Sequence, residues 1–178
     1  MADNYDLAAL IRTIPDHPKP GIMFRDVSTL LLDGQGFRKT IDRMAALVTP
    51  DTQLIGGIEA RGFIVAAGLS YALGLGKLML RKPGKLPGEK IGIDYALEYG
   101  TDRIELHTDQ VLPGQKVVLV DDLIATGGTA LAGIELIRQA GGVVEQALFI
   151  VDLPELGGAD KLRGVGVKPT ALIGFDGH

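Results

Sequence analysis

Residues 117–129 have the sequence VVLVDDLIATGGT, in which four apolar residues run into two carboxylates and a turn of small residues before a helical pattern. The start of a helix offers unpaired N–H groups and a positive dipole end, and both favour an anion. Gly127 and Gly128 let the backbone approach that anion, and Thr126 and Thr129 can add hydroxyl donors. The string therefore predicts a cradle for one phosphate group.

The two acids, Asp121 and Asp122, precede the turn that begins at Ala125. They could accept hydrogen bonds from vicinal sugar hydroxyls or support a hard cation. The alternative is that they end a strand and that the turn is an ordinary loop before an N-capped helix. The length of the string favours a site for phosphate and ribose together. No Walker lysine is present and no strand leads into G-x-G-x-x-G, so nucleotide hydrolysis and dinucleotide binding lose support.

Four short apolar runs predict the buried strands that must position these residues, and helical patterns follow two of them. The strands are expected at 54–58, 77–80, 117–120 and 147–151, and the helices at 63–73 and 130–139. Alternation of this kind gives a parallel sheet with right-handed crossovers, and ligands then bind beyond the carboxyl ends of the strands. We expect an α/β fold with a central parallel sheet flanked by helices.

The composition excludes several classes of protein. The 178 residues fit a single domain (1–178), and the formal charge of −4 without a basic run disfavours a nucleic-acid partner. The chain has no cysteine, so it can form neither a disulfide nor a thiolate zinc site. The first residues are acidic, and no apolar run approaches the length that spans a membrane. We expect a soluble, cytoplasmic protein without a membrane partner.

The region before the first strand is predicted to form an N-terminal cap, residues 1–35. It contains a helical pattern at 6–11 and a proline-rich segment at 15–21, and a further helical pattern follows at 36–48. These elements are too few for a separate domain.

An irregular, charged loop at 82–90 (KPGKLPGEK) leads into a stretch at 91–106 that resembles a hairpin turning near Gly100. Such a loop next to a ligand site is a candidate lid. Residues 82–106 are therefore expected to form a loop and hairpin lid.

The string at 117–129 resembles the binding signature for phosphoribosyl pyrophosphate (PRPP) of type I phosphoribosyltransferases. Four further segments resemble adenine phosphoribosyltransferases, so that the likeness covers nearly the whole chain. These segments are PKPGIMFRD at 18–26, EARG at 59–62, RKPGKLP at 81–87 and YALEYG at 95–100. The resemblance implies the type I fold and a purine salvage reaction, in which adenine and PRPP give AMP and pyrophosphate. It also implies Mg²⁺ on the oxygens of PRPP, near Asp121 and Asp122 and not held by protein side chains alone.

The resemblance assigns the adenine site to Phe24, which would stack on the purine, and to main-chain groups of Met23 and Arg25. Leu153 would contact the other face of the base. Phe24 and Leu153 could instead be core residues, because aromatic and aliphatic side chains usually are. The resemblance does not remove this alternative.

The pyrophosphate site is assigned to the loop of Glu59, Ala60 and Arg61, with a cis peptide bond near Ala60. Backbone N–H groups of this loop, with the Arg61 side chain, would hold the leaving group. The basic residues of a second loop would reach the neighbouring subunit's pyrophosphate, which implies a homodimer. These residues are Arg81, Lys82 and Lys85.

Glu98 corresponds to the acid that manages the proton on the base, and Tyr99 to a residue that closes over the site. Gly88 and residues 90–94 depart from the family's loop sequence. The three histidines match no catalytic position of the family and are interpreted as structural.

Two other functions stay open. One is transfer to a 6-oxopurine such as hypoxanthine, guanine or xanthine. The other is a non-catalytic sensor of PRPP or a purine nucleotide, although such sensors usually carry an added DNA-binding domain, for which this chain has no room.

Overall fold

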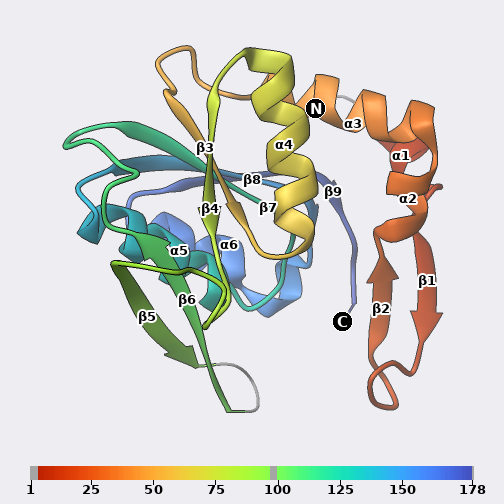
Figure 1. The fold of residues 1–178 in the computed structure, drawn as a ribbon. Coiled ribbons are helices and arrows are strands. Elements are labelled where there is room, and N and C mark those ends of the chain that lie inside the picture. Colours follow the sequence, from red (N-terminus) through yellow and green to blue (C-terminus); the bar gives the residue numbers. More distant parts are fainter. Residues whose placement is uncertain (1–3, 97–99, 178) are drawn as a thin grey trace.

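A five-stranded parallel sheet with the strand order β4-β3-β7-β8-β9 forms the centre of the fold (Figure 1). The computed structural model describes residues 4–96 and 100–177. The strands are β3 (Leu54–Ile58), β4 (Gly76–Leu80), β7 (Lys116–Ile124), β8 (Val143–Asp152) and β9 (Lys168–Gly174). All neighbouring strands pair in parallel, which confirms the predicted fold class.

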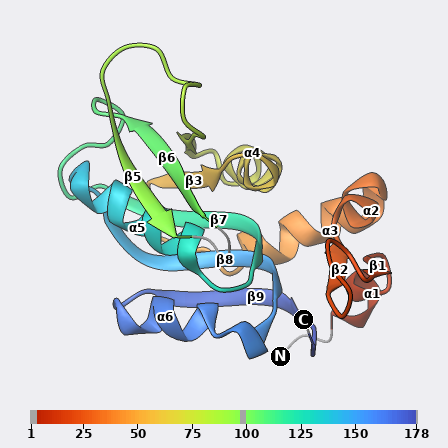
Figure 2. The ribbon, with the colours of Figure 1, turned by 90° about the horizontal axis from the view of Figure 1, so that it is seen from below.

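Both faces of the sheet are buried, because successive side chains of each strand point to opposite faces and both sets are apolar. In β7, Val118 and Val120 pack in a cluster with residues of α3 (Gly34–Ala45) and α4 (Arg61–Leu73). Val117 and Leu119 pack in the opposite cluster with α5 (Gly128–Gln139) and α6 (Gly158–Gly164). Figure 2 shows these helices on the two sides of the sheet.

Three strands differ from the expectation, and one of them is β8, which begins at Val143 and not at Ala147. β7 continues to Ile124 instead of ending before the acids, because Leu123 and Ile124 still pair with β8. The two carboxylates therefore lie within the strand. β9 was not predicted at all; its sequence KPTALIG has a proline at the second position and little apolar character in its first half.

The helices agree with the predictions in position and differ at their ends. α4 ends at Gly74, which adopts the left-handed conformation at φ 66° that a residue without Cβ tolerates. α3 starts earlier than predicted, since the Asp33 carboxylate accepts a hydrogen bond from Gly36 N at 2.6 Å and caps the first turn. The predicted helix at 6–11 is wrong in length, because only α1 (Tyr5–Ala8) is helical. Two short elements were not predicted, α2 (Ser28–Leu32) and the 3-10 turn η1 (Pro154–Leu156).

Two antiparallel hairpins stand on opposite sides of the sheet (Figure 1). The hairpin of β5 (Lys90–Ala96) and β6 (Thr101–His107) matches the predicted turn near Gly100. The hairpin of β1 (Arg12–Pro15) and β2 (Met23–Asp26) was missed because only its prolines were interpreted. Within the described residues, no helix has both the length and the apolar character required to cross a membrane.

Candidate active site

A hollow of about 200 Å³ lies where β7 turns into α5. Gly127 takes a left-handed conformation, φ 81°, immediately before the helix. The structure brings together here six of the residues predicted to bind the ribose phosphate. They are Asp121, Ala125, Thr126, Gly127, Gly128 and Thr129. The hollow has the helix start and small-residue wall that an anion requires.

The start of α6 holds this turn in place, a contact that the sequence analysis missed. Gly158 N donates to the Ala125 carbonyl at 3.0 Å, and Lys161 Nζ donates to the Thr126 carbonyl at 2.8 Å. A Cβ on Gly127 would lie 2.9 Å from Gly158 Cα, so both positions need glycine for the two backbones to touch. The adjacent glycines at 157 and 158 were the signal in the sequence that could have pointed to this brace.

The two carboxylates have different partners. The buried Asp122 side chain forms an ion pair with Arg61 Nε. Asp121 accepts a hydrogen bond from Asp122 N at 2.9 Å. Burial, together with the charge of Asp122, raises the pKa of Asp121 well above its usual value. Asp121 therefore lacks the strong cation that neutralises its neighbour.

Arg61 starts α4, directly after a cis peptide bond between Glu59 and Ala60, where the resemblance implied one. Burial works against its charged form, but the hydrogen bond to Asp122 and the charges of both aspartates outweigh it and raise the pKa of Arg61. Its terminal nitrogens form no hydrogen bond with any described residue, so they can serve an anion. Gly62 lets α4 approach β7, since a Cβ there would lie 2.8 Å from Asp121 Oδ1.

A second cavity, of about 330 Å³, lies between hairpin β1–β2 and the end of β8. It contains all four residues predicted to bind adenine, Met23, Phe24, Arg25 and Leu153, together with Arg61. The other residues of its wall are His17, Pro18, Lys19, Ile22, Leu123, Ala125 and Leu156. Its wall is largely apolar, as a flat aromatic ligand requires.

Phe24 and Leu153 differ in burial. Phe24 is half-buried, outside both core clusters, and meets the His17 ring edge to face at a centroid distance of 5.1 Å. This excludes the alternative of a core anchor for Phe24. Leu153 is 8% exposed and belongs to the core as well as to the cavity wall. His17, interpreted from the sequence as merely structural, lines the cavity.

The predicted basic loop is tied to carboxylates of its own chain. The Glu59 carboxylate accepts from Arg81 Nε at 3.0 Å and from Lys82 N at 2.7 Å. Lys82 Nζ forms an ion pair with Asp102 and donates to the Tyr95 hydroxyl at 2.9 Å. The Arg81 side chain is therefore engaged by the residue that follows β3, and the Lys82 side chain by hairpin residues next to its turn.

Lys85 differs from these two cations. It is exposed and forms no hydrogen bond or ion pair with any residue in the described ranges. The other two predicted residues of the lid, Glu98 and Tyr99, lie outside the described residues.

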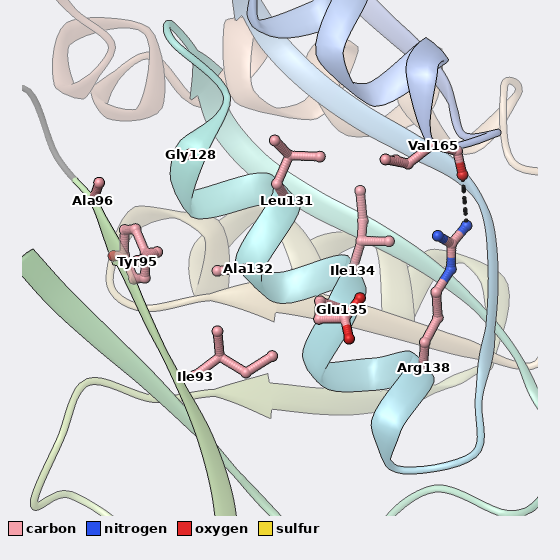
Figure 3. A pocket seen from close by; sticks show the side chains of 10 residues that line it. All are labelled: Ile93, Tyr95, Ala96, Gly128, Leu131, Ala132, Ile134, Glu135, Arg138 and Val165. Atoms are coloured by element: carbon pink, nitrogen blue, oxygen red, sulfur yellow. Dashed lines mark hydrogen bonds between the residues drawn. The ribbon is translucent and has the colours of Figure 1, made fainter.

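A further cavity, of about 400 Å³, lies elsewhere, between β5 and α5 (Figure 3). Leu131 and Ile134 of α5 and Ile93 and Tyr95 of β5 line it. Of the predicted site residues that the structure describes, only Gly128 borders it, and a Cβ there would lie 3.1 Å from the Ala96 carbonyl oxygen. Gly128 thus also lets the hairpin pack against the helix.

The described residues contain no group of three or more histidine, cysteine, aspartate or glutamate side chains that could hold a metal ion. The incompletely neutralised Asp121 carboxylate, beside a hollow suited to an anion, fits a hard cation that is held mainly by the ligand. Mg²⁺ carried by PRPP remains a prediction.

Comparison with known proteins identifies the family. Residues 29–161 match the family model described as "Phosphoribosyl transferase domain". The chain is 58% identical over 174 residues to adenine phosphoribosyltransferase of Erythrobacter litoralis, covering 97% of this chain and 98% of that protein. The crystal structure of adenine phosphoribosyltransferase from Thermoanaerobacter pseudethanolicus gives a TM-score of 0.91 at 45% identity, covering 97% of this chain and 100% of that chain. The enzyme of Giardia lamblia in complex with 9-deazaadenine gives 0.90 at 34% identity, covering 98% and 99%. The chain therefore belongs to the adenine phosphoribosyltransferases of the type I phosphoribosyltransferase family.

Proposed function

We propose that this protein transfers the 5-phosphoribosyl group of PRPP to adenine, giving AMP and pyrophosphate in purine salvage. One observation carries the proposal: Leu123 and Ala125 line both the phosphate hollow and the apolar cavity. A base in the cavity and a 5-phosphate in the hollow are then joined by a ribose beside Asp121 and Arg61. The 9-deazaadenine complex of the Giardia lamblia relative supports adenine as the base.

Charge dominates the proposed chemistry. As the bond at the anomeric carbon stretches, the ribose becomes cationic and the departing pyrophosphate gains negative charge. The free end of the Arg61 guanidinium, with backbone N–H groups near Ala60, would stabilise that leaving group. Mg²⁺ bound to PRPP oxygens would neutralise further charge on the leaving group.

The two aspartates would hold the ribose hydroxyls in different ways. Asp121 is the freer acceptor, whereas Asp122 must share its carboxylate with Arg61. A hydroxyl that donates to the Asp121 carboxylate favours its charged form, which burial otherwise disfavours. Asp122 would act chiefly by keeping Arg61 directed at the site.

Adenine is proposed to lie between Phe24 and Leu153, with its edge recognised by main-chain groups of Met23 and Arg25. This assignment makes residues 1–35 a base-binding cap. Residues 82–106 are proposed as a lid that excludes water, in which Glu98 manages the proton on the base and Tyr99 covers the site.

We also propose a homodimer in which Lys85 reaches the neighbouring subunit's pyrophosphate. Exposed apolar side chains on α4 and the edge strand β4 support such an interface. Ile64 is 45% exposed, Tyr71 93% and Met79 36%. An apolar patch on these two elements would mark a protein interface. Sedimentation would show a dimer, and a Tyr71→Asp and Ile64→Asp double variant would shift it to monomer.

The decisive experiment incubates the protein with PRPP, Mg²⁺ and each of adenine, hypoxanthine, guanine and xanthine. Release of pyrophosphate with adenine at a kcat/KM far above the other bases is expected. Turnover of a 6-oxopurine in preference to adenine would refute the choice of base. Tight PRPP binding without turnover of any base would indicate a sensor instead.

The role of Glu98 is tested separately. If it acts as an acid–base catalyst, Glu98→Ala lowers kcat by about 10²- to 10⁴-fold. A kcat within a few-fold of wild type would refute the proton role.

For the location of the enzyme we propose the cytoplasm, since the cysteine-free composition suits a reducing compartment.

A further inference from the structure

The two walls of the base cavity come from segments far apart in the sequence. Met23 and Phe24 lie on hairpin β1–β2, and Leu153 and Leu156 follow β8. A flat ring held between such walls requires that their spacing be fixed. Figure 1 shows the hairpin beside the C-terminal end of β9, away from the body of the sheet.

The Arg25 side chain links the hairpin to the segment that follows β9. One terminal nitrogen, Nη1, donates to Thr13 Oγ1 at 2.7 Å within the hairpin, and the other, Nη2, donates to the Asp176 carbonyl at 3.1 Å. The guanidinium carbon lies 4.4 Å from the centroid of the Phe175 ring. Arg25 Nε is buried without a hydrogen-bond partner, so the stacked ring and the two hydrogen bonds of the terminal nitrogens together hold this side chain.

The same C-terminal segment is bonded to the opposite wall. Phe175 N donates to the Asp152 carbonyl at 3.1 Å, and Gly177 N donates to Glu155 Oε1 at 3.1 Å. Asp152 immediately precedes Leu153, and Glu155 immediately precedes Leu156. Residues 175–177 therefore bridge one wall of the base cavity to the other.

We propose that Phe175 is a positioning residue for adenine: by stacking on Arg25 it sets the distance between the Phe24 wall and the Leu153 wall. This inference rests on the proposed function, in that the cavity holds the base. Phe175 is not in the cavity wall and would act only through Arg25 and Asp152.

The test compares Phe175→Leu, which removes the aromatic ring, with Phe175→Tyr, which keeps it. Phe175→Leu is expected to raise the KM for adenine about three- to tenfold, because a cation–π contact of this size is lost. The KM for PRPP and kcat stay within twofold, and Phe175→Tyr restores the wild-type KM. Leu172→Ala is the matched control, since it removes apolar packing from β9 without touching Arg25.

A second readout does not depend on turnover. Amide hydrogen exchange in residues 12–26 is expected to accelerate in Phe175→Leu and not in Leu172→Ala, while exchange in α4 stays unchanged. Unchanged exchange in residues 12–26 would overturn the proposed bridge whatever the enzyme's activity. An unchanged adenine KM, or equal rises in both KM values as in a general loss of packing, would overturn its role in base binding. A wild-type protein that does not turn over adenine would refute the proposed function, and the exchange experiment would still decide on the bridge.

Discussion

The phosphate hollow and the base cavity are built in opposite ways. The hollow is formed almost entirely by one continuous stretch, residues 121–130, which joins a central strand to a helix. The base cavity is assembled from the hairpin at 12–26, Arg61, the end of β7 and the segment after β8. One site is part of the core, and the other lies between the core and an appended hairpin.

This difference makes the phosphate hollow rigid and leaves the hairpin wall of the base cavity easier to alter. Backbone contacts between glycines hold the phosphate turn, so it cannot move without disturbing two helices. Side-chain contacts hold the wall of the base cavity on the hairpin side, and these can be altered with little loss of stability. Substitutions at the hollow should therefore change folding and activity together, whereas substitutions on the hairpin side of the cavity should change binding of the base alone.

The largest effect is expected from Gly158→Ala. The added Cβ would overlap the Ala125 carbonyl oxygen and lie 2.8 Å from Gly127 N, and both are backbone atoms that cannot move aside cheaply. Urea denaturation should show a loss of about 3 kcal/mol in the free energy of unfolding, with a large fall in PRPP binding. Gly164→Ala in the same helix has nothing within 4 Å of its new Cβ and serves as the control. Equal stabilities of the two variants would show that the turn is not held as described.

The second-largest effect is expected from Asp121→Asn. This variant should lower kcat/KM for PRPP about 100-fold, because a charged hydrogen-bond acceptor is lost. Because the folded state raises the pKa of this acid, the charged carboxylate costs stability above the unfolded pKa of about 3.9. The variant should therefore be more stable than wild type at pH 7, and this gain should vanish as the pH falls below about 4. Thermal denaturation across pH measures it, and a variant less stable at pH 7 would contradict the assigned burial.

Phe24→Ala tests the base cavity. Stacking on a base contributes about 1–3 kcal/mol, so the KM for adenine should rise about tenfold, with the KM for PRPP little changed. Since Phe24 is half-buried and outside the core clusters, the melting temperature should fall only slightly. Leu153→Ala is the informative partner, because this residue is also in the core and should lose stability as well as adenine affinity. Similar losses of stability in both variants would remove the distinction between the two walls.

The smallest effect is expected from Asp26→Asn at the end of the hairpin that leads into α2. A hydrogen bond from the Ser28 hydroxyl, and then that from Arg12, lower the pKa of Asp26. An acid of this kind stabilises the fold above its unfolded pKa, and the contribution is lost as the pH falls through the folded pKa. Wild type should have a slightly higher melting temperature than the variant at pH 7 and none of this advantage at the acid extreme. The KM for adenine should not change, and a large rise would mean that the ion pair also shapes the base cavity.

The same contrast explains what the sequence could predict. The phosphate hollow was predicted from the residues alone, because strand, acids, turn and helix are consecutive and each has a local physical reason. The base cavity could be predicted only by resemblance. Phe24 and Leu153 line the same cavity but are 129 positions apart in the sequence, and no local pattern indicates that they lie close together. The partners of Lys82 were not predicted because Asp102 and Tyr95 approach it through hairpin pairing. Gly158 was missed because its role depends on contact with a distant turn.

The internal carboxylates of the basic loop also affect how the enzyme would release its product. Arg81, Lys82 and Lys85 would repel one another if nothing else faced them, and Glu59 and Asp102 supply counterions within the same chain. A polyanion that binds there exchanges one set of charge partners for another instead of neutralising bare cations. The affinity for the polyanion is thereby lower and less sensitive to ionic strength. When pyrophosphate leaves, Arg81 and Lys82 can form their ion pairs with Glu59 and Asp102 again.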